Sequence, residues 1–485
     1  MESPSPFETA LLILLVVMIF NLIIFVHELG HFWAAKWRGL KIDRFQIWFG
    51  KPIWKKTING VQYGLGWIPA GGFVALPQMA PMEAIEGNNR DGGQALPPIT
   101  PLDKIIVAFA GPLFSFLLAL AAAVTLTITK KPIDVIYDTT VGWVEKGSPA
   151  EAAGFQRGDK ILAISGKPVT SWNLPLDSVF TNVVTSSGEK IVFTIDRPGQ
   201  GQMELISTYE IEPTKWWQRK KTRQVGLEPM TPEGDFVVSF IDDQPNTPAA
   251  LAGFKVGDVI LEVGGEKLVE WNQFIETISN SGGKPLSFKV KREGQIMDLV
   301  ATPVKPTVKN AKKDTPEPGY RIGMALDSPS PQIEEWVRHS PQQQITDTLR
   351  QMWMTLTTVA DPRSSIGIQH LSGPVGIGKI QYFSLLMEHP FHRILGFMVL
   401  ININLALLNL LPFPVLDGGH ITIAIMEAIA RRPVNVKFLE VLQLGFVFIL
   451  FSIMLYVTSK DLFDDFGFSR SKPMEFIYPE PPTAP

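Results

Sequence analysis

The stretch "IIFVHELGHFWAAK", residues 23–36, places His27, Glu28 and His31 at the end of an almost unbroken apolar run. Imidazoles and carboxylates are costly in hydrocarbon, so ionisable groups in such a run usually mark a functional site. On a helix, histidines four residues apart lie on one face. Both could reach one zinc ion at about 2.0–2.1 Å, with Glu28 as general base toward a zinc-bound water. The alternative is a pair of interfacial histidines at the helix end, which the complete motif on a predicted helix disfavours.

The composition excludes several classes of protein. The 485 residues are 45% hydrophobic and 19% charged, with a mean hydropathy of +0.13. These values are too apolar for a disordered or highly charged chain. The net charge of −3 gives no basic footprint for nucleic acid. Cysteine is absent, so any metal must be held by histidine and carboxylate rather than thiolate.

Four stretches are free of charge for long enough to span a bilayer, which requires about 20 apolar residues. They cover residues 9–26, 105–129, 394–416 and 441–459. The first is not read as a signal peptide, because Glu2 stands where a basic residue is expected and no small-residue cleavage site follows. The predicted fold class is a polytopic α-helical membrane protein with four transmembrane helices, a membrane-associated β-hairpin and two β-rich PDZ-like domains.

Basic residues predict the orientation of the spans. One cluster follows the first span and another lies between spans three and four: Lys36, Arg38, Lys41, Arg44, Lys51, Lys55 and Lys56, then Arg431, Arg432 and Lys437. Both loops are therefore expected in the cytoplasm and both termini outside. Lys130 and Lys131 oppose this orientation, but they precede a large domain, and such domains cross largely regardless of charge.

An internal repeat lies between spans two and three. Residues 148–173 align without gaps on residues 247–272, and 12 of the 26 positions are identical. Each copy predicts a short helix, a Gly-Asp turn and a β-strand, followed by alternating strands. The pattern resembles PDZ domains of the bacterial protease type, which bind extended peptides by adding a strand to a sheet edge. The alternative is a repeat that serves only as a spacer.

Residues 40–76 predict a β-hairpin, because apolar and aromatic residues alternate around Asn59-Gly60, a strong two-residue turn signal. The segment is too apolar for an ordinary loop, so we expect it in the membrane interface, folded back toward the spans. Residues 334–359 predict an amphipathic helix, and the tail "YPEPPTAP", 478–485, is expected to be disordered.

The predicted segments follow in chain order. They are a transmembrane helix with the histidine motif (1–37), the β-hairpin with a cytoplasmic loop (38–102), a second transmembrane helix (103–130), two PDZ-like domains (131–227 and 228–328), an amphipathic connecting segment (329–392), a third transmembrane helix ending in Leu-Asp-Gly (393–417), a cytoplasmic loop (418–440), a fourth transmembrane helix (441–460) and a C-terminal tail (461–485).

A third metal ligand is expected in "NLLPFPVLDGGH", residues 409–420. Spans one and three run in the same direction, so this stretch reaches the membrane depth of His27 and His31. Pro412 and Pro414 break the helix and could bend a ligand inward. Geometry favours Asp417 as the third ligand and leaves His420 as the alternative. Asn409 has an alternative role in a helix–helix hydrogen bond.

These motifs together resemble the site-2 protease family, in particular the bacterial RseP-type regulated intramembrane zinc metalloproteases with tandem PDZ domains. The resemblance rests on HELGH, "AGPLFSF", the repeats, "LSGPVGIGKI" and "NLLPFPVLDGG", in this order. It implies that Asp417 is the third zinc ligand and that His420 supports it. It also implies that Asn409, Pro412 and Pro414 position the substrate, while Gly64, Leu65 and Gly66 help to clamp the substrate strand.

The predicted function is an intramembrane zinc endopeptidase of the bacterial inner membrane that cuts single-span proteins. By resemblance, the expected substrates are an anti-sigma factor or signal-peptide remnants. The lipid bilayer is the other partner, and no nucleic acid is expected. The PDZ-like domains, outside the membrane, would gate access to a zinc site on the cytoplasmic side. One alternative is an inactive scaffold that presents two peptide-binding modules; the other is a protease acting on soluble proteins from the membrane surface.

Overall fold

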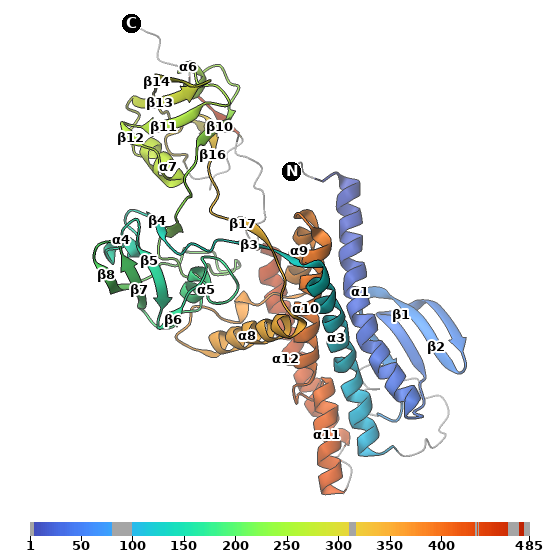
Figure 1. Cartoon of the computed structure of the whole chain (residues 1–485). Coiled ribbons are helices and arrows are strands. Elements are labelled where there is room, and N and C mark those ends of the chain that lie inside the picture. The colour runs from blue at the N-terminus through green and yellow to red at the C-terminus, as the bar shows by residue number, and fades with distance from the viewer. Residues whose placement is uncertain are drawn as a thin grey trace.

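The computed structural model describes residues 4–79, 99–309, 317–431, 434, 436–463 and 475–479. Among these residues, the helices long and apolar enough to cross a membrane are Pro6–Trp37 (α1), Pro101–Thr129 (α3), Pro390–Asn409 (α10) and Phe438–Phe463, which is most of α12 (Val436–Phe463). They stand side by side as a bundle (Figure 1). Each predicted span coincides with one of these helices, except at the end of the third. The predicted loop at 80–102 lies mostly outside the described residues.

Local capping explains where α1 and α3 begin. Ser5 and Thr100 are N-caps with a proline at the next position, and each forms a capping box with the acid three residues on, Glu8 or Asp103. Asp103 also accepts a hydrogen bond from Arg38 Nε at 2.7 Å. This ion pair joins the end of α1 to the start of α3.

Helix α3 is the centre of the bundle and packs against α1, α10 and the short helix α11 (Asp417–Ala430). Its buried face carries small residues, and Ala119, Ala122 and Ala123 contact the α10 side chains Val399 and Ile403. Small residues allow helix backbones to approach closely, which is the usual way that membrane helices associate.

The third span is shorter than predicted. Helix α10 ends at Asn409, an apolar loop follows, and Asp417 begins α11. The expectation that residues 394–416 form one span and 418–440 a loop is therefore wrong. Pro412 and Pro414 end the helix because proline lacks an N–H and disfavours helical geometry in the preceding residue.

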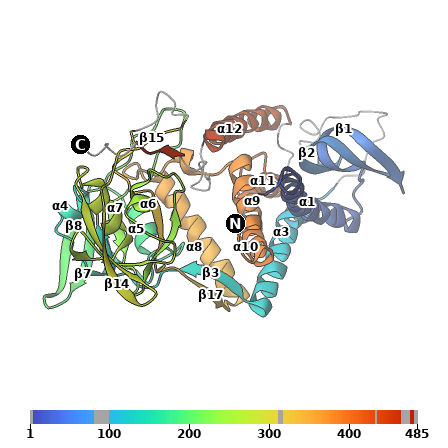
Figure 2. The same cartoon turned by 90° about the horizontal axis from the view of Figure 1, so that it is seen from above.

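The hairpin prediction is confirmed, with one addition. Asn59 and Gly60 have positive φ angles of 48° and 82°, and Ile58 pairs with Val61 across them. The strands β1 (Arg44–Ile58) and β2 (Val61–Ala75) each bend, so residues 62–65 pair with 44–47 on one side and with 54–57 on the other. Residues 72–75 pair with the outer side of 44–47. Seen from above, this sheet and the two repeats flank the helices on opposite sides (Figure 2).

The first repeat forms a β-rich domain. Its elements are β4 (Val141–Val144), α4 (Pro149–Ala152), β5 (Lys160–Ile164), β6 (Lys167–Pro168), α5 (Val179–Val184), β7 (Ile191–Arg197), β8 (Gly201–Ser207) and β9 (Leu227–Pro229). One sheet has the order β6-β5-β7-β8, and β4 pairs with β9.

The second repeat has the same succession of elements with one more strand, β15, before the last. They are β10 (Phe236–Ile241), α6 (Pro248–Leu251), β11 (Val259–Val263), β12 (Glu266–Lys267), α7 (Trp271–Ser279), β13 (Leu286–Arg292), β14 (Gln295–Ala301), β15 (Thr307–Val308) and β16 (Met324–Asp327). Its main sheet has the order β14-β13-β11-β10-β16. An arginine pairs with the buried aspartate of the Gly-Asp turn in both repeats, Arg197 with Asp159 and Arg292 with Asp258.

The connecting segments complete the described chain. They are β3 (Lys131–Val135), β17 (Ile333–Val337), α8 (Pro341–Ala360), the 3-10 turn Ile368–His370, α9 (Pro374–Leu386) and β18 (Phe476–Ile477). The predicted helix at 334–359 begins only at Pro341, because β17 pairs with β3 as a two-stranded ribbon. Helix α9 was not predicted, and β18 pairs with β15, at the edge of the tail that we expected to be disordered.

Candidate metal and catalytic site

Three side chains from two distant parts of the chain converge at the cytoplasmic-side end predicted for α1. His27 Nε2 lies 3.3 Å from His31 Nε2 and 3.3 Å from Asp417 Oδ2, and His31 Nε2 lies 3.4 Å from Asp417 Oδ1. All three residues are buried. Donors placed around a centre about 2.1 Å away in a tetrahedron lie about 3.4 Å apart. The three donors therefore fit a zinc ion, which takes imidazole and carboxylate ligands.

Helix α3 orients both imidazoles from behind. His27 Nδ1 lies 2.9 Å from Ser115 Oγ, and His31 Nδ1 lies 2.8 Å from the carbonyl oxygen of Val107. With a proton on Nδ1, each ring donates to α3 and leaves Nε2 free as a metal ligand. The sequence analysis missed Ser115 and Val107. A hydroxyl and a backbone carbonyl in an apolar span carry no spacing signal that would reveal them.

Glycines allow α1 and α3 to approach closely at the site. A Cβ at Gly30 would lie 2.3 Å from the carbonyl oxygen of Ala110, and one at Gly111 would lie 2.2 Å from His31 Nε2. These two positions therefore exclude a larger side chain for steric reasons. Gly111 belongs to the "AGP" stretch that opened the predicted second span.

A cavity of about 200 Å³ opens beside the three ligand candidates. Its lining includes Glu28, Asn409, His420 and the edge-strand residues Gly72 and Val74. The Glu28 carboxylate accepts a hydrogen bond from the backbone N–H of Val74. Several water molecules fit in such a volume, and its polar lining provides partners for them.

The remaining predicted site residues are placed differently from one another. Asn409 Nδ2 lies 3.4 Å from His27 Nε2, so this amide faces the ligand cluster, and its partner belongs to the neighbouring helix α1. Among the described residues, the donor atoms of His27, His31 and Asp417 lie close enough together to share one metal ion. His420 is not part of this group. Pro412 and Pro414 do not line the cavity; the Pro414 carbonyl instead accepts a hydrogen bond from Gln443 of α12 at 3.0 Å.

The stretch 64–66, which we expected to offer a free edge to the substrate, lies inside the sheet. Gly64 pairs with Gln46 and Lys55, and Leu65 pairs with Ile47 and Trp54, so this stretch is internal to the sheet and away from the cavity. An internal strand has no free backbone groups to offer a further strand. Among the described strands, the sheet edge that lines the cavity is formed by residues 72–75.

The comparisons with known proteins fit this site. Residues 15–453 match the description "Peptidase family M50". The chain belongs to peptidase family M50. It is accordingly a zinc metalloendopeptidase of the site-2 protease type, with a catalytic zinc ion as its cofactor. The three buried donors fit that ion, and the second group of possible donors among the described residues, Glu334, Glu388 and His389, is exposed.

Relatives cover almost the whole chain. A protein of Pasteurella multocida named as a zinc metalloprotease is 28% identical over 442 residues, which are 86% of this chain and 91% of the relative. The regulator of sigma-E protease RseP of Escherichia coli is 27% identical over 474 residues, 93% of this chain and 97% of the relative. Among solved structures, the PDZ domain of an SdrC-like protein from Listeria monocytogenes aligns with 20% of this chain and 93% of its own, at 23% identity and a TM-score of 0.16.

Proposed function

We propose that this M50 peptidase hydrolyses a peptide bond within the transmembrane segment of single-span membrane proteins. The observation that carries the proposal is the position of His27, His31 and Asp417. They are buried between helices long enough to span a membrane and lie next to a polar cavity. A protease that acted on soluble proteins would have little use for a site at this depth.

Each residue of the site has a proposed role. His27, His31 and Asp417 hold the zinc ion, which supplies a water of lowered pKa and polarises the scissile carbonyl when it is bound. Glu28 takes the proton of the attacking water and returns it to the leaving amine. The Asn409 amide, next to His27, is suited to hold a carbonyl oxygen of the substrate backbone.

The edge strand 72–75 is proposed to hold the substrate open. A peptide bond in a helix is hydrogen-bonded and surrounded by side chains. Unwinding the helix in hydrocarbon exposes backbone N–H and C=O groups, and each unpaired group costs several kcal/mol. The Val74 N–H already points from the sheet edge toward Glu28. Because successive residues of a strand point their backbone N–H and C=O groups to opposite edges, Gly72, two residues before Val74, offers the next outward pair. A substrate paired there as an added strand would present its backbone to the catalytic groups.

The repeats are proposed to be PDZ-like domains that restrict access. In Figure 1 the second repeat lies beyond the end of the bundle opposite α11, which begins with Asp417, and the first repeat lies beside the bundle, away from α11, so we expect neither to touch the scissile bond. By analogy with relatives named regulators of sigma-E protease, we propose an anti-sigma factor or signal-peptide remnants as substrates. The proposed location is the bacterial inner membrane, with both termini and the repeats outside and the zinc site toward the cytoplasm.

The test is cleavage of a detergent-solubilised single-span peptide, with Glu28→Gln as the control. The amide keeps the shape of the side chain and cannot accept the proton of the water. We expect wild type to cut within the span, and the variant to lose at least the 10²–10⁴-fold that general-base catalysis typically contributes. Zinc content should stay unchanged. Cleavage of soluble proteins only would favour the surface protease, and no cleavage by wild type would favour an inactive peptide-binding scaffold.

A further inference from the structure

The C-terminal segment 475–479 is docked on the second repeat as a short strand. Phe476 and Ile477 pair antiparallel with Thr307 and Val308, so β18 extends from β15. Side chains alternate along the segment: Tyr478 is 4% exposed and Phe476 is partly buried, whereas Ile477 is 49% exposed. This period of two is the pattern of a strand that turns one face to a protein surface. Pro479 favours the extended conformation of Tyr478 before it.

Polar contacts hold the backbone of this segment at defined points. The Gln244 side chain donates to the Phe476 carbonyl oxygen at 2.6 Å, and the Asn246 side chain donates to the carbonyl oxygen of Tyr478. The Lys309 N–H donates to the Glu475 carbonyl oxygen at 2.8 Å. Backbone groups are thus recognised from both sides, which does not depend on the sequence of the bound segment.

The two inward side chains provide the specificity. The Arg321 guanidinium lies over the Phe476 ring, 4.4 Å from its centroid, which is a cation–π geometry. Tyr478 packs against Gly323, where a Cβ would come within 3.0 Å of the ring. Gly323 has a φ of +77°, so its position favours glycine for two separate reasons. The residue before Phe476 is the acid Glu475, whose carboxylate forms an ion pair with the Lys309 ammonium at 2.6 Å.

The docking site is specific to the second repeat. Five residues, 242–246, connect Ile241 to Thr247, whereas only three, 145–147, connect Val144 to Ser148 in the first repeat. Gln244 and Asn246 are part of this longer loop. Arg321 corresponds to Gln224, because Ile322 and Val225 accept equivalent hydrogen bonds from Ala249 and Ala150. The first repeat therefore lacks the groups that hold the tail.

The docked tail also leaves room beside it. A cavity of about 510 Å³ lies between α7 and β16, lined by Phe274, Ile278 and Met324 and, on one side, by Phe476 and Tyr478. If the tail left, its site and this cavity would form one continuous groove. A longer extended peptide than the tail could then occupy it.

We propose that the second repeat carries a binding site for extended peptides of the pattern acid–aromatic–x–aromatic, and that residues 475–478 of the chain itself are its resident ligand. An external peptide of this chemistry binds by displacing the tail. The proposal concerns binding outside the membrane and does not depend on the proposed protease substrates.

The first test is whether the tail is docked in the intact chain. The chain has no cysteine, so Thr307→Cys with Ile477→Cys introduces a single pair, at positions that are register partners. We expect this pair to form a disulfide under mild oxidation, because paired strands bring Cα atoms within disulfide range. Glu212→Cys with Ile477→Cys, which places the first cysteine in the first repeat, is the matched control and should not. Equal cross-linking of both pairs would overturn the proposal.

The second test is competition in the full-length protein in detergent. The probe is a fluorescein-labelled synthetic peptide with the sequence of residues 473–485, and anisotropy reports its binding. We expect Phe476→Ser with Tyr478→Ser to bind the probe at least about tenfold more tightly than wild type, since one tenfold step equals 1.4 kcal/mol of released competition. Ile477→Ser, which changes an exposed residue of the same segment, should behave like wild type.

Further variants locate the binding site in the tail-released protein. Asn246→Ala or Arg321→Ala should weaken probe binding at least about fivefold, as expected for loss of one hydrogen bond or one cation–π contact. Asp243→Ala, at an exposed position of the same loop, should not. The proposal fails if the probe binds wild type and tail-released protein equally, if it binds neither, or if Asn246→Ala and Asp243→Ala are indistinguishable.

Discussion

At the scale of single residues, the site depends on groups that are not themselves ligands. His27 and His31 can turn Nε2 toward one point because Ser115 and the Val107 carbonyl fix their Nδ1 atoms from α3. Gly111 leaves the space that both rings occupy. The helix that contributes no ligand therefore determines the tautomer and the ring orientation of two ligands on its neighbour.

The distances distinguish the two candidates for the third ligand. We expect Asp417→Ala to lose the zinc ion, because this carboxylate lies 3.3 Å and 3.4 Å from the two imidazole nitrogens. His420→Ala should keep most of the zinc, since His420 lines the cavity without joining the ligand cluster. Metal analysis of the purified variants measures both. Zinc retained in Asp417→Ala and lost in His420→Ala would assign the ligand to His420.

Removing the hydroxyl behind His27 should weaken metal binding without abolishing it. Ser115→Ala leaves the His27 ring free to rotate, and loss of such a supporting hydrogen bond typically costs about 10–100-fold in metal affinity. Competition with a chelator of known affinity measures the change. Thr125→Ala is the control on the same helix, since its hydroxyl bonds only to the Ala121 carbonyl of its own turn. Equal affinities of the two variants would contradict a role for Ser115.

At the scale of elements, the clearest local patterns predicted the structure best. Apolar length gave the membrane helices, and Asn59-Gly60 gave the hairpin turn, because both depend on residues close in sequence. No charged residue marks the end of the third span, because the loop from Leu410 to Leu416 is as apolar as the helix before it. Pro412 and Pro414 were expected to break the helix, and α10 does end before them at Asn409, but the predicted span continued through them to residue 416.

The expectation of a free sheet edge at residues 64–66 failed for a similar reason. The strand β1 turns back near Trp48 and Gly50, which have positive φ angles of 67° and 88°. As a result, the segments 54–57, 62–65, 44–47 and 72–75 lie side by side in one sheet, in this order. This turn makes residues 64–66 internal and 72–75 an edge. Which strand is at an edge depends on all pairings together, and no short stretch of sequence specifies it. The convergence of His27 and His31 was predictable because HELGH places both on one helix face by helix geometry alone.

The edge strand gives a prediction about how substrates are held. Gly72→Pro removes an N–H that faces the cavity and should lower cleavage at least about tenfold, the effect of one hydrogen bond lost in an apolar site. Gly72→Ala keeps the N–H and is the control for the added carbon, which would lie 3.3 Å from Glu28 and Ile24. Zinc content should be unchanged in both.

Substrate stability provides the second measurement for this strand. Substrates with helix-weakening residues near the cut should lose less activity in Gly72→Pro, because less pairing is needed to keep them open. Rates for a stable and a weakened single-span peptide would be compared in each variant. Equal losses for both peptides, or equal effects of proline and alanine, would argue against strand addition at residues 72–75.

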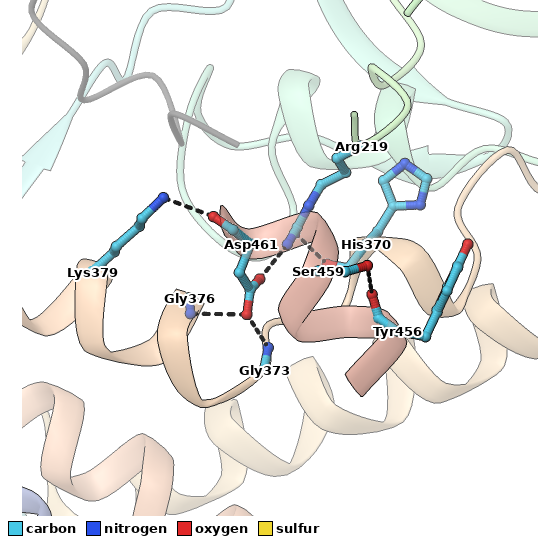
Figure 3. A network of polar contacts seen from close by, with 8 residues as sticks. All are labelled: Arg219, His370, Gly373, Gly376, Lys379, Tyr456, Ser459 and Asp461. Carbon is cyan, nitrogen blue, oxygen red and sulfur yellow. Dashed lines mark hydrogen bonds and ion pairs between the residues drawn. The ribbon is translucent and has the colours of Figure 1, made fainter. Parts of the chain in front are cut away.

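At the scale of the whole molecule, one buried carboxylate connects the first repeat to the membrane helices. Asp461 of α12 is fully buried and accepts hydrogen bonds from the N–H groups of Gly373 and Gly376 at the start of α9, both at 2.9 Å. Arg219, from the loop between β8 and β9 of the first repeat, donates to it at 2.7 Å (Figure 3). The same arginine donates to the His370 carbonyl at 3.0 Å. This ion pair is one of several contacts between the first repeat and α12, since the Lys460 ammonium of α12 also donates to the Trp216 carbonyl oxygen at 2.6 Å.

The last prediction separates the stability of this connection from its role in selectivity. Arg219→Gln leaves a buried carboxylate without its cation and should destabilise the protein by about 3–5 kcal/mol. Adding Asp461→Asn removes that charge, so the double variant should recover much of the loss while the ion pair stays broken. If the repeats restrict access, the double variant should cut substrates with bulky outer domains faster than wild type and small substrates at an unchanged rate. Thermal unfolding and paired cleavage assays measure the two effects, and unchanged selectivity in a folded double variant would make this ion pair a purely structural connection.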